Sequence, residues 1–233
     1  MTTPAVPPAS QPTSPPDVSA LSIGVLGGTG PQGRGLGRRL AAAGHTVVLG
    51  SRDAGRAAEA AAPLAAAGLP VTGADNATAA AADVVIVAVP YDGHAALLAD
   101  LADTLTGRIV VDCVNPLGFD KQGAFPLAVP AGSAAQEAAA ALPGARVVAA
   151  FHHVSAVLLE DPAVTTFDSD VLVLGDDREA TDIVAALAAR IPGMRGVYAG
   201  RLRNAGQVEA LTANLISVNR RYTAHAGIRV TDI

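Results

Sequence analysis

The residues GGTGPQG at positions 27–33 follow an apolar run, LSIGVL, and precede a segment of helical composition, RGLGRRLAAA. Gly28, Gly30 and Gly33 have the G-x-G-x-x-G spacing of dinucleotide-binding turns. In such a turn the first glycine permits the sharp bend, the second lets the backbone approach a pyrophosphate, and the third allows close helix packing. Free N–H groups at the start of the helix then face the phosphates. The stretch therefore predicts a bound dinucleotide, with a purely structural turn as the alternative.

The residues after the next strand indicate which dinucleotide is bound. Thr46–Leu49 is the expected strand, and Gly50, Ser51 and Arg52 follow it. An acidic residue at this place would bind the adenosine ribose hydroxyl and repel a phosphate. Here a hydroxyl lies beside a guanidinium, with Arg56 one helical turn further on, and this set suits a 2′-phosphate. The sequence favours NADP over NAD, with solvated loop residues as the alternative.

Outward from the glycine turn, strand and helix patterns alternate along the chain. Runs at 83–90, 108–114 and 145–151 are apolar, as expected of strands buried on both faces of a parallel sheet. A further strand is expected at 170–175, and helices at 54–67, from 76, after a capping box of Ser133 and Gln136, from 178, and over 206–223. The alternation predicts an α/β fold with a Rossmann-type, doubly wound and mostly parallel sheet.

Composition excludes several classes of protein. The 233 residues are 50% hydrophobic and carry a net charge of −5, which gives no basic field for nucleic acid. The only cysteine, Cys113, lies in an apolar run, so we expect a buried thiol in a reducing cytoplasm. Residues 1–20 hold six prolines without a signal-peptide pattern, which predicts a disordered tail. No apolar segment approaches the roughly 20 residues of a membrane span, so no membrane is expected.

Exclusion also narrows the chemistry. Short-chain dehydrogenases need a Tyr followed four residues later by Lys, whereas the three tyrosines here are followed by Ala95, Leu202 and Ala226. The single lysine, Lys121, lies in a loop sequence where a solvated side chain is expected. His152 and His153 are adjacent, so on a regular strand they point to opposite faces and do not chelate one metal ion. Without an acid–base pair or a metal, we expect catalysis by placement of the reacting groups.

Several stretches in order resemble one known family. The segments IGVLGGTGPQGRGLGRRLAAAGHTVVLGSR, DVVIVAVP, FHHVSA and LGDDREA, with a long last helix, are similar to NADPH-dependent reductases of the deazaflavin coenzyme F-420. The similarity covers residues 21–230. It implies an enzyme that passes hydride reversibly between NADP(H) and F-420, with an NADP-binding Rossmann domain over 21–150. A small α/β or helical C-terminal domain over 151–233 would close the cleft, and we expect a homodimer.

The resemblance also implies roles for individual residues. His152 and Val154 would contact the deazaflavin, although His152 has a structural role at the strand end as its alternative. Ser155 departs from the family pattern, where a proline is common, and Asn115 lies in a variable loop. The residues implied for the adenosine half of NADP are Thr29, Gly30, Pro31, Gln32, Ser51, Arg52 and Arg56, and those for the nicotinamide half are Val89, Asn115 and Ala156.

Charge is unevenly distributed along the chain. Residues 190–233 hold seven arginines and two acids, whereas residues 1–189 hold nine basic and nineteen acidic side chains. F-420 carries a phosphodiester and an oligoglutamate tail, so a cationic mouth would steer it, while solvated arginines or a dimer interface are equally consistent with the pattern. Two other functions remain open from the sequence: an NADPH-dependent reductase of small imines or ketones, and an NADP-binding sensor without turnover.

Overall fold

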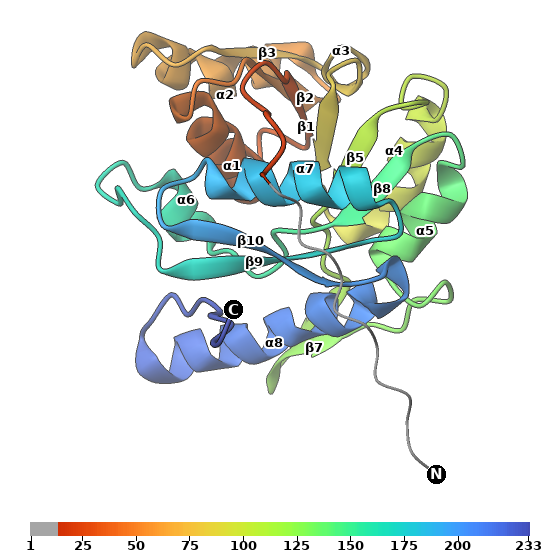
Figure 1. Cartoon of the computed structure of the whole chain (residues 1–233), viewed down its shortest axis with the longest axis vertical. Coiled ribbons are helices and arrows are strands. Elements are labelled where there is room, and N and C mark those ends of the chain that lie inside the picture. Colours follow the sequence, from red (N-terminus) through yellow and green to blue (C-terminus); the bar gives the residue numbers. More distant parts are fainter. Residues whose placement is uncertain (1–13) are drawn as a thin grey trace.

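A computed structural model of the chain, in which residues 14–233 are described, contains an eight-stranded sheet (Figure 1). Its order is β10-β9-β8-β5-β4-β1-β2-β3, and neighbours run parallel except that β9 is antiparallel to β8. The prediction of a mostly parallel, doubly wound sheet is confirmed. The strands are β1 (Ile23–Leu26), β2 (Val47–Ser51), β3 (Val71–Asp75), β4 (Val84–Val87), β5 (Ile109–Asp112), β8 (Arg146–Ala149), β9 (Ser169–Gly175) and β10 (Met194–Gly200).

Helices cover both faces of the sheet, and each face has its own apolar core. In β4, Val84 and Ile86 belong to one core while Val85 and Val87 belong to the other, which explains why this strand is apolar throughout. The first core includes side chains of α1 (Pro31–Ala42), α2 (Ala54–Ala66), α6 (Ala156–Glu160) and α7 (Arg178–Ala189). The second includes side chains of α3 (Asn76–Ala80), α4 (His94–Leu101), α5 (Ala134–Ala141) and α8 (Ala205–Tyr222).

The C-terminal part continues the same sheet. β9 pairs with β8 through Val148 and Ala149, and β10 pairs with β9. The expected boundary between residues 150 and 151 therefore lies just after β8, inside a continuous sheet. What extends beyond the sheet is α8, which lies beneath β9 and β10 in Figure 1, together with the segment that follows it.

Some elements were not predicted from the sequence. β6 (Leu117–Asp120) and β7 (Gly123–Pro126) form an antiparallel hairpin beside α8 (Figure 1), and Lys121 is exposed in its turn, as expected. Short 3-10 helices at Tyr91–Gly93 and Leu202–Asn204 lead into α4 and α8. The capping box forms in part: the Ser133 hydroxyl accepts from the Gln136 N–H at 3.0 Å and contacts the Gln136 Oε1 at 3.2 Å.

The N-terminal prediction needs a correction at Val18. Residues 1–13 of the expected tail lie outside the described residues, but Val18 is 4% exposed and belongs to the first core. Its carbonyl accepts from the Leu21 N–H at 3.1 Å, and Ser19 N–H donates to the Asp17 carboxylate at 2.9 Å. A single apolar residue between two polar ones lacks the periodic pattern that marks a docked segment, so the sequence analysis missed it.

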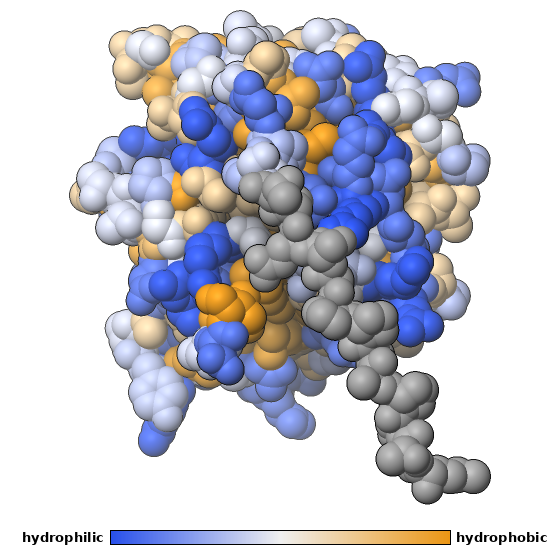
Figure 2. All heavy atoms as spheres, in the orientation of Figure 1, coloured by the Kyte–Doolittle hydropathy of each residue, from blue (hydrophilic) through white to orange (hydrophobic). Residues whose placement is uncertain are grey.

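The distribution of apolar side chains on the surface is consistent with their burial in the two internal cores. On the face drawn in Figure 2, apolar side chains gather in small patches that hydrophilic side chains separate. No helix within residues 14–233 is long and apolar enough to cross a membrane.

The cysteine is buried, as predicted. Cys113 is 5% exposed, and its thiol donates to the Val87 carbonyl at 3.0 Å. Burial raises the pKa of this thiol.

Candidate cofactor and substrate site

The glycine turn connects β1 to α1, and its glycines serve different purposes. Gly27, one residue before the motif, has the left-handed φ of +76° that the bend requires. A Cβ on Gly28 would lie 2.9 Å from Leu49 Cα, and one on Gly33 would lie 2.7 Å from the Gly27 carbonyl oxygen. Close packing therefore requires glycine at both positions. At Gly30 the nearest atom to such a Cβ is 3.4 Å away, so this side of the turn is comparatively open for a ligand.

The start of α1 provides N–H groups for phosphate. Gly30 is the N-cap without a side-chain cap, and Pro31 is the first helical residue. The first N–H groups of a helix have no partner within it, and they attract anions together with the helix dipole. The Thr29 hydroxyl has no hydrogen-bond partner among the described residues, and the Thr29 carbonyl accepts from Arg34 Nη1 at 3.3 Å. This geometry fits the pyrophosphate of a dinucleotide.

The end of β2 lies beside the turn, since Gly28 N–H donates to the Gly50 carbonyl at 2.9 Å. Ser51, the last strand residue, is buried, and its hydroxyl accepts from the Asp53 N–H at 3.2 Å. Asp53 caps α2 and accepts from two backbone N–H groups, so its carboxylate is occupied locally. The side chains of Arg52 and Arg56 are exposed and have no partner among the described residues. Their guanidinium groups are free to bind a 2′-phosphate.

A pocket of about 350 Å³ opens at the carboxyl ends of β4, β5 and β8, where open α/β sheets bind ligands. We call it the strand-end pocket. It adjoins the glycine turn, because a Cβ on Gly27 would lie 2.8 Å from Val89 Cγ1. The structure brings together in its lining six residues that the sequence analysis singled out: Gln32, Val89, Asn115, His152, Val154 and Ala156.

The chain after β8 is held in a strained bend by polar contacts. Phe151 is fully buried with a left-handed φ of +63°, which is unusual for a large side chain. Its carbonyl accepts from Gln32 Nε2 at 3.1 Å. The His152 carbonyl accepts from Asn115 Nδ2 at 2.8 Å and from the Thr212 hydroxyl at 3.2 Å. Backbone strain of this kind clusters at functional sites, and here it sets the position of His152.

His152 is the most distinctive polar group in the pocket. Its side chain is 3% exposed in total, and neither ring nitrogen has a hydrogen-bond partner among the described residues. Burial lowers its pKa to about 4, against the smaller opposing effects of the Asp112 charge and of the backbone of Val114 and Cys113, which lies near the ring without forming a well-aligned hydrogen bond. The ring is therefore neutral at pH 7, with one donor and one acceptor left unpaired in the pocket. Buried polar groups are rarely left without partners, so these atoms fit a ligand.

His153 turns to a different partner. Its Nε2 donates to the Asp170 carbonyl on β9 at 2.8 Å, and burial lowers its pKa to about 4. Within residues 14–233, no three His, Cys, Asp or Glu side chains are grouped to hold a metal ion.

The side of the pocket opposite β4 comes from α8 and the segment after it. Sequence analysis did not identify these residues, although their spacing of three and four along α8 is that of one helix face. Thr212 is the polar member and contacts Asn115 Oδ1 at 3.4 Å. We call the set the C-terminal wall; it consists of Thr212, Leu215, Ile216, Asn219 and Ala226.

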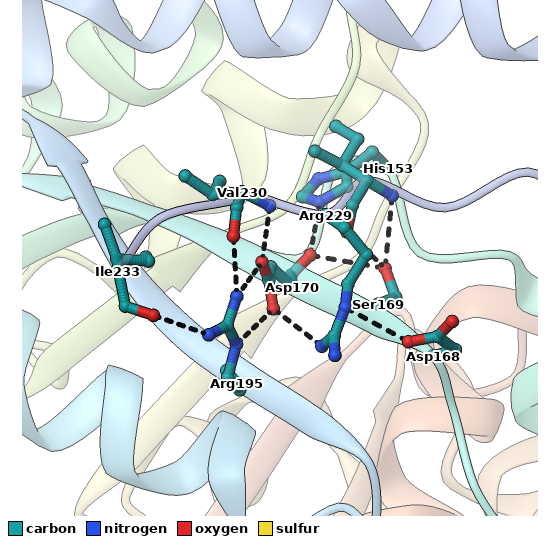
Figure 3. A network of polar contacts seen from close by, with 9 residues as sticks. His153, Asp168, Ser169, Asp170, Arg195, Arg229, Val230 and Ile233 are labelled. Carbon is teal, nitrogen blue, oxygen red and sulfur yellow. Dashed lines mark hydrogen bonds and ion pairs between the residues drawn. The ribbon is translucent and has the colours of Figure 1, made fainter.

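A buried carboxylate fixes the end of this wall (Figure 3). Asp170 is 0% exposed and accepts from Arg195 Nε at 2.8 Å and Nη2 at 2.7 Å, from Arg229 Nη1 at 3.1 Å, and from the Val230 N–H at 2.7 Å. Its own N–H donates to the Ile228 carbonyl at 2.7 Å. We call these contacts the Asp170 clamp. They tie the segment after α8 to β9 and β10, and so hold Ala226 against the pocket.

Beneath the pocket lies a second buried polar group, which the sequence analysis also missed. Asp112, at the end of β5, accepts from His94 Nε2 at 2.6 Å and from the Val114 N–H at 3.0 Å. Burial lowers the pKa of His94, but the hydrogen bonds and charges of Asp112 and Glu137 together outweigh this and leave it raised. Glu209 on α8 is 2% exposed and caps α5 through Ala134 and Ala135, and burial raises its pKa to about 7. These contacts join α8 to α5 beside the pocket floor.

Known proteins resemble the chain over nearly its whole length. Residues 22–116 match the family described as "NADP oxidoreductase coenzyme F420-dependent". The "F420-dependent NADP reductase" of Methanothermobacter thermautotrophicus is 40% identical over 226 residues, covering 93% of this chain and 97% of that protein. The protein of the same name from Methanocaldococcus jannaschii is 37% identical over 224 residues, covering 91% and 99%.

A solved structure from Arthrobacter species FB24, provisionally described as an F420-dependent NADP reductase, has a TM-score of 0.76 at 29% identity. It covers 91% of this chain and 100% of its own. Fold and site thus define a Rossmann-type, dinucleotide-dependent oxidoreductase. Sequence identity then gives the particular family: this chain belongs to the F420-dependent NADP reductases.

Proposed function

We propose that this enzyme transfers a hydride reversibly between NADP(H) and coenzyme F-420, as the names of its relatives indicate. The observation that supports this most directly is the position of the strand-end pocket. It adjoins the glycine turn, and one of its lining residues is buried His152, whose ring nitrogens have no hydrogen-bond partner among the described residues. A dinucleotide on the turn would therefore present its nicotinamide to a second ring in the pocket.

The residues would act by placement. Transfer between two ring carbons needs reacting atoms about 3–3.5 Å apart, and most of the rate enhancement can come from that alignment. Val89, Asn115 and Ala156 would lie along the nicotinamide, and His152 and Val154 along the deazaflavin. The neutral His152 ring would give one hydrogen bond to the deazaflavin, while the proton for its ring nitrogen would come from water.

The adenosine end would be held by the turn and by the end of β2. Backbone N–H groups at the start of α1 would bind the pyrophosphate, near Gly28, Thr29, Gly30 and Gly33. Buried Ser51 and the two unpaired arginines, Arg52 and Arg56, would bind the 2′-phosphate. A guanidinium recognises a phosphate through two parallel hydrogen bonds, so this set supports NADP as the dinucleotide.

We also propose a cytoplasmic homodimer. The buried, unpaired Cys113 is consistent with a reducing compartment. Large apolar side chains are exposed on α8 and on the hairpin outside the lining of the groove between them, namely Phe125 (41%), Val218 (38%) and Tyr222 (72%), and a partner subunit would cover them. Light scattering after size exclusion would test the dimer.

The function itself is tested by mixing purified protein with NADPH and oxidised F-420. Loss of the deazaflavin absorbance, matched by NADPH oxidation, is the expected result, and reduced F-420 with NADP should run the reaction backwards. NADPH consumption with small imines or ketones but not with F-420 would replace the proposal by the reductase alternative. NADPH binding without oxidation by any acceptor would leave the sensor.

A further inference from the structure

The arginines of the C-terminal part separate into two groups. Four are committed to the protein itself: Arg190 donates to the Ala43 carbonyl, Arg201 pairs with Asp176, and Arg195 and Arg229 belong to the Asp170 clamp. The other three, Arg203, Arg220 and Arg221, are exposed and have no hydrogen bond or ion pair among the described residues. In this C-terminal part, these three arginine side chains are therefore the ones available to bind an anion.

Two of these places line one groove. Arg220 and Arg221, in the last turn of α8, border a groove of about 570 Å³ between α8 and the β6–β7 hairpin. We call it the hairpin groove. The rest of its lining is Phe119, Asp120, Gln122, Gly123, Ala124, Ile216 and Ser217. Its one acid, Asp120, has an oxygen that accepts from two backbone N–H groups of the hairpin turn, so this oxygen is bound within the turn.

The hairpin groove adjoins the strand-end pocket along α8. Ile216 lines both, and one turn further along α8 come Asn219, in the pocket, and Arg220, in the groove. A molecule whose ring lies in the pocket can therefore extend along α8 into the groove. Arginine suits phosphates and carboxylates because its planar fork donates two parallel hydrogen bonds to either group.

We propose that the hairpin groove binds the anionic side chain of F-420, its phosphodiester and glutamate carboxylates, through Arg220 and Arg221. This inference rests on the proposed function, because it takes the deazaflavin ring to be the occupant of the strand-end pocket. Residues 190–233 carry an excess of positive charge, and the inference gives the role of binding the anionic side chain to two of their arginines.

The test compares F-420 with the same deazaflavin riboside without phosphate or glutamates. In the double variant Arg220→Gln/Arg221→Gln, KM for F-420 should rise about tenfold, because two solvent-exposed ionic contacts are lost. kcat, KM for NADPH and KM for the tail-less deazaflavin should stay unchanged. Arg203→Gln removes one positive charge from an exposed position outside the groove, and it should leave every parameter as it is.

The dependence of KM on ionic strength gives a second test. KM of the wild type for F-420 should rise with ionic strength more steeply than KM of the double variant, since screening weakens exposed charge pairs. An equal change of KM for both deazaflavins, or no change for either, would overturn the inference. A lower melting temperature with unchanged KM would also overturn it, and would show that the two arginines only stabilise the end of α8. If the wild type reduces neither deazaflavin, the proposed function itself fails.

Discussion

The C-terminal wall lines the strand-end pocket and the glycine turn adjoins it, but the two regions are held in different ways. The turn is fixed by local backbone contacts, such as Gly30 N–H to the Gly27 carbonyl at 3.0 Å, and by missing side chains. The wall is fixed by side chains from distant parts of the chain. Asp170 and Arg229 are 59 positions apart, and their partner Arg195 comes from a third segment. The turn is therefore sensitive to an added atom, and the wall to a removed one.

This difference predicts that the two ligands can be uncoupled. A change in the wall outside Thr212 should affect mainly the deazaflavin, since Thr212 is the wall residue that contacts Asn115 on the nicotinamide side. A change at the end of β2 should affect NADP. If every variant changed both ligands together, the two regions would form one cooperative unit instead.

The largest effect is expected for Asp170→Ala. Removing the buried carboxylate leaves Arg195, Arg229 and the Val230 N–H without their partner. The two arginines are 41% and 46% exposed and can be rehydrated, so the free energy of unfolding should fall by about 3 kcal/mol, the lower end for a broken buried pair. KM for F-420 should rise severalfold at temperatures where the variant is folded, and NADPH binding should persist. Unchanged KM for F-420 would show that the clamp does not position the wall.

The same clamp predicts an acid limit of stability. Hydrogen bonds from Arg195, followed by the Val230 N–H and the charges of both arginines, hold the pKa of Asp170 down to about 2. The unfolded carboxyl has a pKa of about 3.9, so the contribution is present above that value and is lost as pH falls towards 2. Urea unfolding of Asp170→Asn should depend less steeply on pH between about 4 and 2 than unfolding of the wild type. Parallel curves would contradict the assignment.

The second effect is on the turn side. Arg52→Ala should lower kcat/KM for NADPH by about 10- to 150-fold, equivalent to the 1.5–3 kcal/mol of a charge-assisted phosphate contact. Use of NADH and KM for F-420 should hardly change, because NADH lacks the 2′-phosphate. Arg203→Ala is the matched control for loss of one exposed positive charge. Equal losses with NADPH and NADH would refute the assignment of Arg52.

The sequence was informative where structure is local. The turn, the N–H groups of α1 and the residues Ser51 and Arg52 lie within one β-α-β unit, so spacing alone indicates their arrangement. Even there, the bend is made by Gly27 before the motif, and β2 extends to Ser51 instead of ending at Leu49. The six predicted pocket residues came from the family resemblance, and the structure brings them together without testing their roles.

Structure that depends on distant contacts was missed. β6, β7 and β10 are mostly not buried, and LGFD, GAFP and MRGVYAG contain glycines and lack regular apolar alternation. Which face of α8 meets the pocket depends on where Glu209 docks against α5. Asp170 looks in sequence like an ordinary strand residue, and only the return of residues 228–230 makes it a clamp.

The next prediction separates stability from positioning. A chain that begins at residue 19 lacks Val18, which is buried in the first core, and should lose about 1–2 kcal/mol of stability. Its KM values for both ligands should match those of the full chain at temperatures where it is folded, because Val18 does not line the pocket. A chain that begins at residue 14 keeps every described residue and is the control. If the shorter chain melts at the same temperature as this control, burial of Val18 contributes nothing.

The smallest effect is expected at the contact between the two regions, in His152→Ala. Because burial lowers the pKa of His152 to about 4, the ring is neutral at pH 7, which is poorly suited to an obligatory acid. Loss of one positioning hydrogen bond should raise KM for F-420 by about 3- to 10-fold, leave NADPH binding nearly intact and create no new pH dependence between pH 6 and 8. His152→Asn, which keeps a donor and an acceptor, should recover part of the loss.

A thousandfold fall in kcat at unchanged KM would make His152 the proton donor, because acid catalysis contributes roughly 10²–10⁴-fold. Unchanged kinetics would leave the ring a purely structural group, whose burial at the end of β8 serves the bend at Phe151 and not the ligand.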